Sequence, residues 1–445
     1  MWKKILCVLV TLCLIVGMIG GLTEFLRPDV TGSRFSPYFQ KDGQEYDVLF
    51  LGSSRGVMAN LPMELWNQYG VTSYNLGQYG QTLAMDYWML KNALNYHTPK
   101  VVVLDIYQMV LNHKFYEGHL YSVVNSLCAI PWSRDKVDTI NDVMPENLRI
   151  NAYVPFAAYH SRWQDVDKTF FEEPEPNYER GAEAGKDLID MVRYDGVFVD
   201  SDPAQYTVVT GNPADYLRKS IELCQQNGIQ VVLTSIPSCY DWEQVRLTLN
   251  YAYVIAEKYG VPLYDGISRK TVDERIDMYD FGHVNASGGK KWTSALGAYM
   301  VEQFGLASHK GEAGFEIWDA DFAAYNAQKL QRLQSQTLMK NVLMLCADRN
   351  ISVSLRIRGS SGFLNDAQIA ALVENLALGE SVPGLAEAIR TGSDYSLSIP
   401  RGQSPVEDTL PPQDPSIALE ITATDTLNPQ NTLTLRFRPD AAIVQ

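Results

Sequence analysis

Short apolar runs alternate with helical segments over most of residues 46–305, and this alternation limits the fold more than any other feature of the chain. The clearest runs are residues 46–51 (YDVLFL), 101–106 (VVVLDI) and 229–235 (IQVVLTS). Strands covered on both faces have such nearly continuous apolar sequences, because neither face meets water. Strands that alternate with helices predict an α/β fold, with a parallel sheet that has helices on both faces.

The remaining elements of this sheet domain are shorter or are marked by glycines. Two further strands are expected at residues 72–75 and 261–265. Gly228 and Gly260 each follow a helical segment, where a left-handed residue commonly ends a helix. Residues 110–205 interrupt the alternation, and their many prolines predict an irregular insertion. The expected helices are residues 61–69, 82–96, 214–227, 242–259 and 286–304.

The N-terminus carries a membrane signal. Residues 5–22 contain no charge, and as a helix these eighteen residues are about 27 Å long, enough to cross a hydrocarbon core. Lys3 and Lys4 precede them, which places the N-terminus in the cytoplasm and the remaining chain outside. A single-pass anchor in the cell membrane is favoured over a cleaved signal peptide, because the run is longer than the usual apolar region of about 7–15 residues. A buried core helix is the third interpretation.

These patterns divide the chain into four parts. They are a membrane anchor (1–29), an α/β domain (30–306), a linker with a helix at 319–335 (307–337) and a smaller α+β domain (338–445). In the last part we expect one helix and four strands. The helix is residues 366–378, and the strands are residues 342–346, 395–399, 417–424 and 433–437.

Composition excludes several classes of function. With 37 basic and 52 acidic side chains the net charge is −15, which disfavours binding to nucleic acid. Apolar residues make up 46% of the chain, so buried cores are expected. The four cysteines outside the apolar run show no CxxC pair, and no Cys/His cluster has the spacing of zinc ligands. We therefore expect no metal and no cofactor. One disulfide bond is possible.

The first motif with chemical meaning is Gly52-Ser53-Ser54-Arg55, directly after the first strand. In open parallel sheets, ligands bind at the carboxyl ends of the strands. A serine at this edge, close to the start of the next helix, is well placed for a reaction that develops negative charge. The alternative is an ordinary Gly-Ser-Ser turn.

The second motif is Asp280-x-x-His283, just before the last helix of the α/β domain. A serine hydroxyl needs a base to take its proton, and a histidine base needs a carboxylate to fix its tautomer. A spacing of three residues lets Asp280 reach the ring of His283. The alternatives are a turn or cap residue for Asp280 and an ordinary surface position for His283.

The third motif is the glycine-containing loop at residues 75–82, which follows the second strand. Gly77 and Gly80 permit a bend that directs backbone N–H groups at an oxyanion, and Thr82 can cap the next helix. A simple glycine-rich turn is the alternative.

In this order, the three motifs resemble the SGNH (GDSL-like) hydrolase family over residues 46–305. The resemblance implies a flavodoxin-like α/β fold, with Ser54 as nucleophile and Ser53 at the position of the family's aspartate. It implies that Asp280 and His283 complete a triad, and that the N–H groups of Ser54 and Gly80 bind the oxyanion. The family's third-block asparagine is absent after strand 101–106, and Gln108 is the candidate substitute for its amide donor.

The departures from the family pattern resemble its extracytoplasmic esterase and O-acyltransferase branch, which includes the teichoic-acid D-alanylation and alginate acetylation proteins. This branch implies a cell-envelope polysaccharide or teichoic polymer as substrate, and a membrane-bound O-acyltransferase as a candidate partner. Residues 155–163 resemble the same branch. They are candidates for contact with the substrate, and the alternative is that they only pack the insertion. Arg55 is a candidate for binding a substrate phosphate or carboxylate, or for a structural ion pair. Residues 338–400 resemble the interleukin-like EMT-inducer domain.

The sequence thus predicts a membrane-anchored extracytoplasmic serine esterase or O-acyltransferase. One alternative is a degenerate scaffold that binds envelope glycan or an acyltransferase without chemistry. Another is a structural anchoring subunit whose C-terminal domain recruits a partner. Neither the acyl group nor the acceptor can be read from the sequence.

Overall fold

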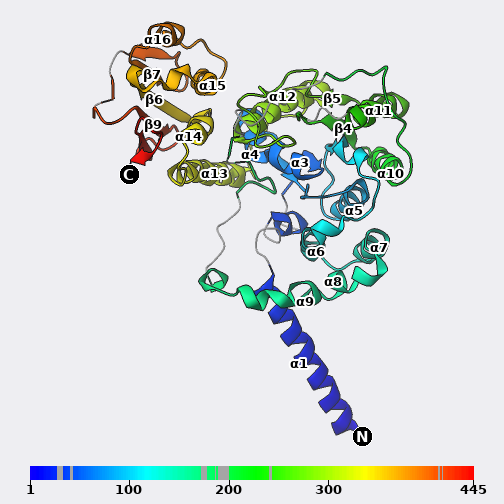
Figure 1. Cartoon of the computed structure of the whole chain (residues 1–445). Coiled ribbons are helices and arrows are strands. Elements are labelled where there is room, and N and C mark those ends of the chain that lie inside the picture. The colour runs from blue at the N-terminus through cyan, green and yellow to red at the C-terminus, as the bar shows by residue number, and fades with distance from the viewer. Residues whose placement is uncertain are drawn as a thin grey trace.

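A computed structural model describes residues 1–27, 34–40, 44–171, 178–185, 187–188, 200–239, 243–408, 411–412 and 414–444. Figure 1 shows a long helix, α1 (Trp2–Leu26), projecting from an α/β body, with a second, smaller sheet domain beside that body. The expected boundary at residues 29–30 lies outside the described residues.

The α/β body contains a five-stranded parallel sheet in the order β2-β1-β3-β4-β5. Its strands are β1 (Val48–Leu51), β2 (Ser73–Asn75), β3 (Val101–Asp105), β4 (Gln230–Ser235) and β5 (Leu263–Asp265). This is the flavodoxin-like order of doubly wound sheets, in which ligands bind beyond the carboxyl ends of the strands. The predicted α/β fold with a parallel sheet is confirmed.

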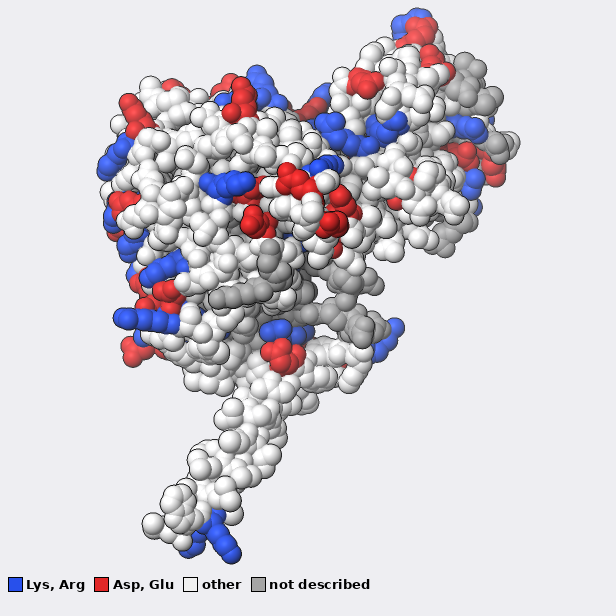
Figure 2. All heavy atoms as spheres, turned by 180° about the vertical axis from the view of Figure 1, so that it is seen from behind, with Lys and Arg blue, Asp and Glu red and all other residues white. Residues whose placement is uncertain are grey.

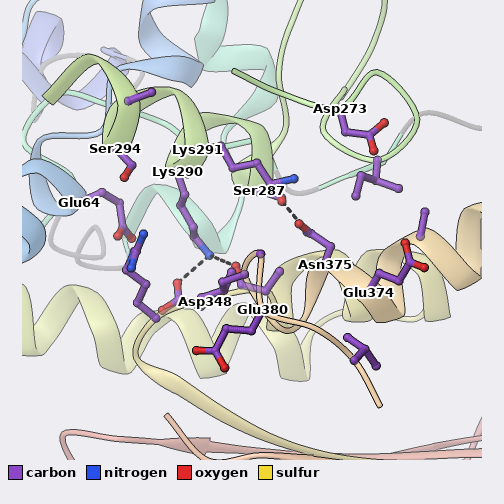
Figure 3. A pocket seen from close by; sticks show the side chains of 18 of the residues that line it. Glu64, Asp273, Ser287, Lys290, Lys291, Ser294, Asp348, Glu374, Asn375 and Glu380 are labelled. Atoms are coloured by element: carbon purple, nitrogen blue, oxygen red, sulfur yellow. Dashed lines mark hydrogen bonds and ion pairs between the residues drawn. The ribbon is translucent and has the colours of Figure 1, made fainter. Parts of the chain in front are cut away.

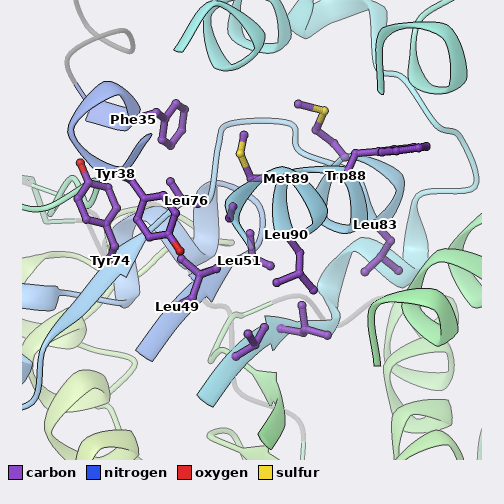
Figure 4. Packing of buried hydrophobic residues seen from close by; sticks show 14 of the residues in the cluster. Phe35, Tyr38, Leu49, Leu51, Tyr74, Leu76, Leu83, Trp88, Met89 and Leu90 are labelled. Carbon is purple, nitrogen blue, oxygen red and sulfur yellow. The ribbon is translucent and has the colours of Figure 1, made fainter. Parts of the chain in front are cut away.

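Alternate residues of β1 pack into different cores, because successive side chains point to opposite faces of a sheet. Leu49 and Leu51 lie in one core with Leu90, as Figure 4 shows, whereas Val48 and Phe50 lie in another. Helices cover both faces, which explains why the strand sequences are apolar throughout. The helices are α4 (Pro62–Tyr69), α5 (Leu83–Ala93), α10 (Asn212–Gln226), α11 (Glu243–Tyr259) and α12 (Ala286–Phe304).

The insertion contains more regular structure than its prolines predict. Its longest helices are α6 (Leu120–Ala129) and α7 (Arg134–Val143), followed by the short helices α8 (Ile150–Tyr153) and α9 (Phe156–Tyr159). Pro155 is the residue directly before α9. The expectation of an irregular segment was wrong here, because proline is well accommodated at the start of a helix. The parts of the insertion at 172–177 and 189–199 lie outside the described residues.

The C-terminal sheet is antiparallel and has the order β11-β10-β9-β6-β7-β8. Its strands are β6 (Ile351–Ile357), β7 (Tyr395–Ile399), β8 (Val406–Asp408), β9 (Leu419–Asp425), β10 (Thr432–Phe437) and β11 (Ile443–Val444). The helices with it are α13 (Glu316–Gln334), α14 (Met339–Cys346), α15 (Ala367–Asn375) and α16 (Leu385–Thr391). The sheet and these helices form the predicted α+β arrangement.

One strand of this part was predicted wrongly. Residues 342–346 belong to helix α14, and all five of these side chains are buried. A short apolar run that is buried all round has no periodicity by which strand and helix can be told apart. The strand that was missed, β6, lies a few residues later and alternates between buried and more exposed side chains.

A buried group of charged side chains joins the two domains. Lys329 of α13 lies 2.8 Å from Glu64 of α4 and 2.9 Å from Asp348, which follows α14. Lys290 of α12 lies 2.6 Å from the same Asp348. Figure 3 shows Lys290 extending toward Asp348 along the wall of an interdomain cavity of about 820 Å³. These opposite charges compensate one another's burial at the contact between the two domains.

Candidate active site

The predicted nucleophile lies in a tight turn at the carboxyl end of β1. Ser54 is the first residue of the short helix α3 (Ser54–Ala59), which the sequence analysis did not identify. Gly52 allows this turn to approach β3 closely, since a Cβ at residue 52 would lie 2.8 Å from the Cβ of Asp105. The Ser54 side chain is half-buried. The N–H groups of the first turn of a helix have no acceptor within that helix, so they are available to an anion beside Ser54.

The structure brings Ser54, His283 and Asp280 into one hydrogen-bonded row. Ser54 Oγ lies 2.7 Å from His283 Nε2, and His283 Nδ1 lies 2.8 Å from one oxygen of Asp280 and 2.9 Å from the other. A carboxylate only accepts hydrogen bonds, so Nδ1 carries the proton and donates it to Asp280. In the neutral ring Nε2 is then an acceptor, and the Ser54 hydroxyl donates to it.

The loop that carries Asp280 and His283 holds both side chains in place. Asp280 accepts hydrogen bonds from the backbone N–H groups of Gly282, at 2.8 Å, and of His283, at 2.9 Å. Partial burial by itself would raise the pKa of Asp280, but the hydrogen bond from the His283 ring and these backbone donors outweigh it and lower that pKa. Asp280 therefore stays ionised and fixes the histidine tautomer.

Packing of α12 on α3 brings the histidine loop to the serine turn. Thr293 of α12 donates to the backbone carbonyl of Ala59 at 2.7 Å, and Trp292 donates to the Asn60 side chain at 2.9 Å. At Gly289 the two chain segments approach so closely that a Cβ would lie 2.7 Å from the Met58 carbonyl oxygen. These contacts span more than 200 residues of sequence and fix the distance between base and nucleophile.

Two buried carboxyl groups lie beneath the serine turn, and the sequence analysis did not assign either of them. Asp105, at the end of β3, accepts from the Ser53 hydroxyl at 3.3 Å and from the Tyr107 N–H at 3.1 Å. Burial raises the pKa of Asp105, and the nearby Arg55 guanidinium opposes that rise. An acidic residue at the end of an otherwise apolar strand was the signal that could have identified it.

The second buried carboxyl group is Asp86 of α5. It accepts hydrogen bonds from the side-chain amides of Gln81, at 2.5 Å, and Gln108, at 2.6 Å, and also from the backbone N–H of Gly52. Burial raises the pKa of Asp86 to about 8, although these hydrogen bonds partly oppose the shift. Together, Asp86 and Asp105 contact two consecutive residues of the serine turn, so we call them the buried carboxyl pair.

Three other predicted site residues are not in the row of Ser54, His283 and Asp280. Gln108 is buried and its amide donates to Asp86, so its contacts do not support an oxyanion role. Arg55 is buried with its guanidinium 3.5 Å above the Tyr107 ring, which favours the structural alternative over substrate contact. Gly80 has a φ of +68°, and a Cβ there would meet the His119 ring at 2.3 Å. Within the described residues, no hydrogen bond joins Gly80 to Ser54.

A cleft of about 380 Å³ opens beside His283. Tyr79 and Tyr279 line it together with Glu183, Asp187 and His283. Neither tyrosine was selected from the sequence. Aromatic rings and carboxylates give this cleft both flat apolar surfaces and hydrogen-bond acceptors.

No family model and no curated protein sequence matches this chain. Among solved structures, the chain is similar to a Bacteroides fragilis protein assigned as an acylhydrolase, with 13% identity and a TM-score of 0.31, over 61% of this chain and 98% of that chain. It is also similar to an acetyl xylan esterase from the rumen bacterium Butyrivibrio proteoclasticus, with 8% identity and a TM-score of 0.23, over 59% of this chain and 65% of that chain. Similarity at this level says nothing about substrate, so the chemistry is assigned from the contacts of the site itself.

Proposed function

We propose that the protein is a membrane-anchored, extracytoplasmic serine esterase or O-acyltransferase that acts on acyl esters of a cell-envelope polysaccharide or teichoic polymer. The observation that carries this proposal is the row of Ser54, His283 and Asp280, with hydrogen-bond distances of 2.7 and 2.8 Å. This is the geometry needed for a serine hydroxyl, a base and the group that orients the base. The order of the three motifs, which resembles the SGNH hydrolases, supports the same assignment.

In the proposed reaction, Ser54 Oγ attacks the carbonyl carbon of the acyl ester while His283 Nε2 takes the hydroxyl proton. The ester oxygen then leaves as an alcohol and receives that proton from His283. Water or a sugar hydroxyl then attacks the acyl carbon and loses its proton to His283, which passes that proton to the departing Ser54 oxygen and restores the free hydroxyl. The two outcomes, hydrolysis and transfer, differ only in the acceptor that reaches the acyl-enzyme.

The oxyanion of the tetrahedral intermediate would be bound by backbone N–H groups. The Ser54 N–H is available for this because it lies in the first turn of α3. Gly80 is the second donor proposed, since a loop that requires glycine can turn its N–H toward a ligand. Gln108 is not part of this proposal, because its amide is already bound to Asp86.

Anchoring through α1 is supported by how the helix meets the folded body. The helix is long and apolar enough to cross a membrane. At its end, Thr23 and Leu26 are buried against the body, and Leu26 belongs to the main core. Cleavage near residue 25 would remove part of this packing, so a retained helix is favoured over a cleaved signal. The two lysines at the start of α1 favour an extracytoplasmic body.

Labelling with a fluorophosphonate tests the proposed function. The reagent should form an adduct with Ser54 in the full-length protein and with no residue of the turn in Ser54→Ala. Ser53→Ala is the matched control, since it alters the neighbouring hydroxyl and leaves the nucleophile. Labelling that persists in Ser54→Ala, or is absent from the folded wild-type protein, would refute the assignment and favour a scaffold that only binds glycan.

A further inference from the structure

Exposed apolar side chains gather on the insertion beside the end of α1. We call this surface the apolar platform and define it by five side chains, each at least one-third exposed. They are Ile150, Val154, Trp163, Val166 and Phe171. Trp163 is 65% exposed and Phe171 is 74% exposed, which is costly for side chains of this size in contact with water. Large apolar side chains exposed together on neighbouring short elements indicate a site of interaction.

The platform is packed directly against the end of the membrane helix. The Phe25 ring of α1 lies 5.8 Å from the Phe170 ring and 5.7 Å from the Phe171 ring. Arg162 donates a hydrogen bond to the backbone carbonyl of Leu26. Figure 1 shows α9 beside the end of α1, with the short helices of the insertion running across the helix axis. These contacts fix the platform relative to the axis of α1.

Helix geometry gives the depth of the platform in a bilayer. From Lys4 to Phe25 the helix rises about 32 Å, at about 1.5 Å per residue. This is close to the thickness of a hydrocarbon core, about 30 Å. Figure 2 shows that the helix surface is uncharged between the basic residues at its tip and the charged residues where it joins the body. With Lys4 at the inner boundary, Phe25 and the Phe171 ring in contact with it lie at the outer boundary.

The side chains of the platform are those that favour this boundary. Tryptophan and other aromatic residues are enriched where hydrocarbon meets the lipid headgroups, and basic side chains extend to the phosphates. Arg162 lies next to Trp163 of the platform in the chain, and its guanidinium lies 5.0 Å from the Phe170 ring centre. Lys168 lies on the same segment.

We propose that the apolar platform rests in the outer interfacial layer of the bilayer, with Trp163 and Phe171 inserted among the lipids. Lipid is the occupant because the platform is continuous with α1, which lipid surrounds at the same depth. The inference rests on the membrane anchoring of the proposed function. It adds a second point of attachment, which holds the body at one height and one tilt above the membrane.

The proposal gives residues 155–163 a role in packing at the membrane instead of the predicted contact with substrate. Their helix α9 and the turn that follows it, His160–Asp165, pack beside α1. This arrangement favours packing of the insertion, and places the segment at the membrane. The catalytic edge of the sheet is then presented to a polymer at a fixed distance from the lipid surface.

Photolabelling in nanodiscs tests this proposal. The full-length protein is placed in nanodiscs that contain only phospholipid, including one with a diazirine near the glycerol region, and adducts are mapped by mass spectrometry. We expect adducts on peptides that contain Trp163 and Phe171, besides those on α1. Val406 and Leu427 serve as internal controls, because they are 58% and 52% exposed and belong to the C-terminal domain, which Figure 1 shows away from α1.

A pair of matched variants sharpens the test. Trp163→Gln with Phe171→Gln should reduce adducts on residues 150–171 by at least about tenfold, since the loss of even one of these large apolar side chains lowers transfer into lipid by about that factor. Val406→Gln with Leu427→Gln should leave these adducts unchanged. Absence of adducts on 150–171 while α1 is labelled would overturn the proposal and favour a protein partner on the platform. Equal labelling of Val406 and Leu427 would also overturn it.

The same nanodisc sample separates this proposal from the proposed function. Fluorophosphonate labelling of Ser54 tests the proposed nucleophile and does not require the platform to contact lipid. An adduct at Ser54 without lipid adducts on the platform would refute the lipid contact and leave the proposed function standing. Loss of adducts on α1 itself would remove the anchoring and the platform together.

Discussion

The hydrogen-bonded row of Ser54, His283 and Asp280 and the buried carboxyl pair lie at the same edge of the sheet, and both contain aspartate. Asp280 is 44% exposed, accepts hydrogen bonds from the His283 ring and from two backbone N–H groups, and has a lowered pKa. Asp86 in the buried pair has no exposed surface, and burial raises its pKa to about 8. Three N–H donors contact each of these carboxyl groups, so the difference in burial, and not the residue type or the number of donors, decides which of them carries charge at neutral pH.

The two groups also have different contacts. In the proposed reaction Asp280 orients the ring that moves the proton, whereas Asp86 and Asp105 bind the backbone of Gly52 and the hydroxyl of Ser53. We therefore treat the buried pair as positioning residues, which act on the reaction through the geometry of the serine turn. Substitutions in the two groups should differ in size and in pH dependence.

The largest loss of activity is expected from substitution of the proposed nucleophile, Ser54, or the proposed base, His283. Ser54→Ala and His283→Ala should each lower kcat on a chromogenic acetyl ester by roughly 10⁵-fold or more, because the residues act as one unit. The double variant should be little worse than either single variant. Initial rates from purified full-length protein measure this. A His283→Ala protein that retains near-normal hydrolysis would exclude histidine as the base.

The next largest effect is expected from Asp280→Asn. The amide cannot hold the His283 tautomer that leaves Nε2 free to accept the serine proton, so kcat should fall by about 10⁴-fold. Thermal unfolding should change little, because the Asp280 side chain is partly exposed. If Asp280→Asn costs less than tenfold, another group orients the histidine.

A smaller effect is expected from Asp105→Asn in the buried pair. Loss of the carboxylate that accepts from Ser53 should shift the serine turn and lower kcat by about 10²-fold, the cost of misplacing a reacting group by about 1 Å. Ser53→Asp alone should be worse, because it places two carboxyl groups side by side. Combining Ser53→Asp with Asp105→Ser should recover part of the activity.

Asp47→Asn is the matched control for Asp105. Asp47 is also buried and sits just before β1, at the opposite edge of the sheet, where it pairs with Lys100 at 2.7 Å. Its loss should reduce the melting temperature without changing kcat. Equal losses of kcat in the two variants would mean that Asp105 serves stability and does not position Ser54.

Asp86→Asn should have the smallest effect on rate and the clearest effect on how the stability of the fold depends on pH. Because burial raises the folded pKa of Asp86 from its ordinary 3.8 to about 8, its contribution to stability is full below about pH 4 and is lost as the pH rises through 8. Asparagine does not titrate, so the variant should lose less stability over this range than the wild type. Chemical unfolding at pH 4, 6, 8 and 9 measures the difference. Parallel curves for the two proteins would show that Asp86 is not a titrating group.

Much of the fold could be predicted from local patterns. The strand runs at 101–106 and 229–235 were found because a strand covered on both faces is apolar throughout. Helix α12 was predicted with its observed bounds, since Asn285 caps its start and Gly305 ends it in a left-handed conformation. The failures were of another kind. Residues 342–346 are apolar on every side, so no period distinguishes a strand from a helix there.

For the candidate site too, some residues could be predicted from the sequence and others depended on the tertiary structure. Asp280 and His283 could be paired from sequence because a spacing of three residues lets their side chains meet, and Ser54 could be selected because its turn follows a buried strand and its register resembles that of the SGNH serine. The side-chain directions of Arg55 and Gln108 could not be predicted, since partners from β3 and α5 turn both of them into the interior.

The sequence by itself determined which residues can act as nucleophile, base and orienter, because those roles depend on chemical type and on local spacing. Tertiary structure decided that Ser54 and His283, 229 residues apart, lie 2.7 Å from each other, through the packing of α12 on α3. It also decided that Asp86 is fully buried while Asp280 is partly exposed. The physical reason is that burial comes from elements distant in the chain, and the difference in burial sets the charge of these carboxyl groups.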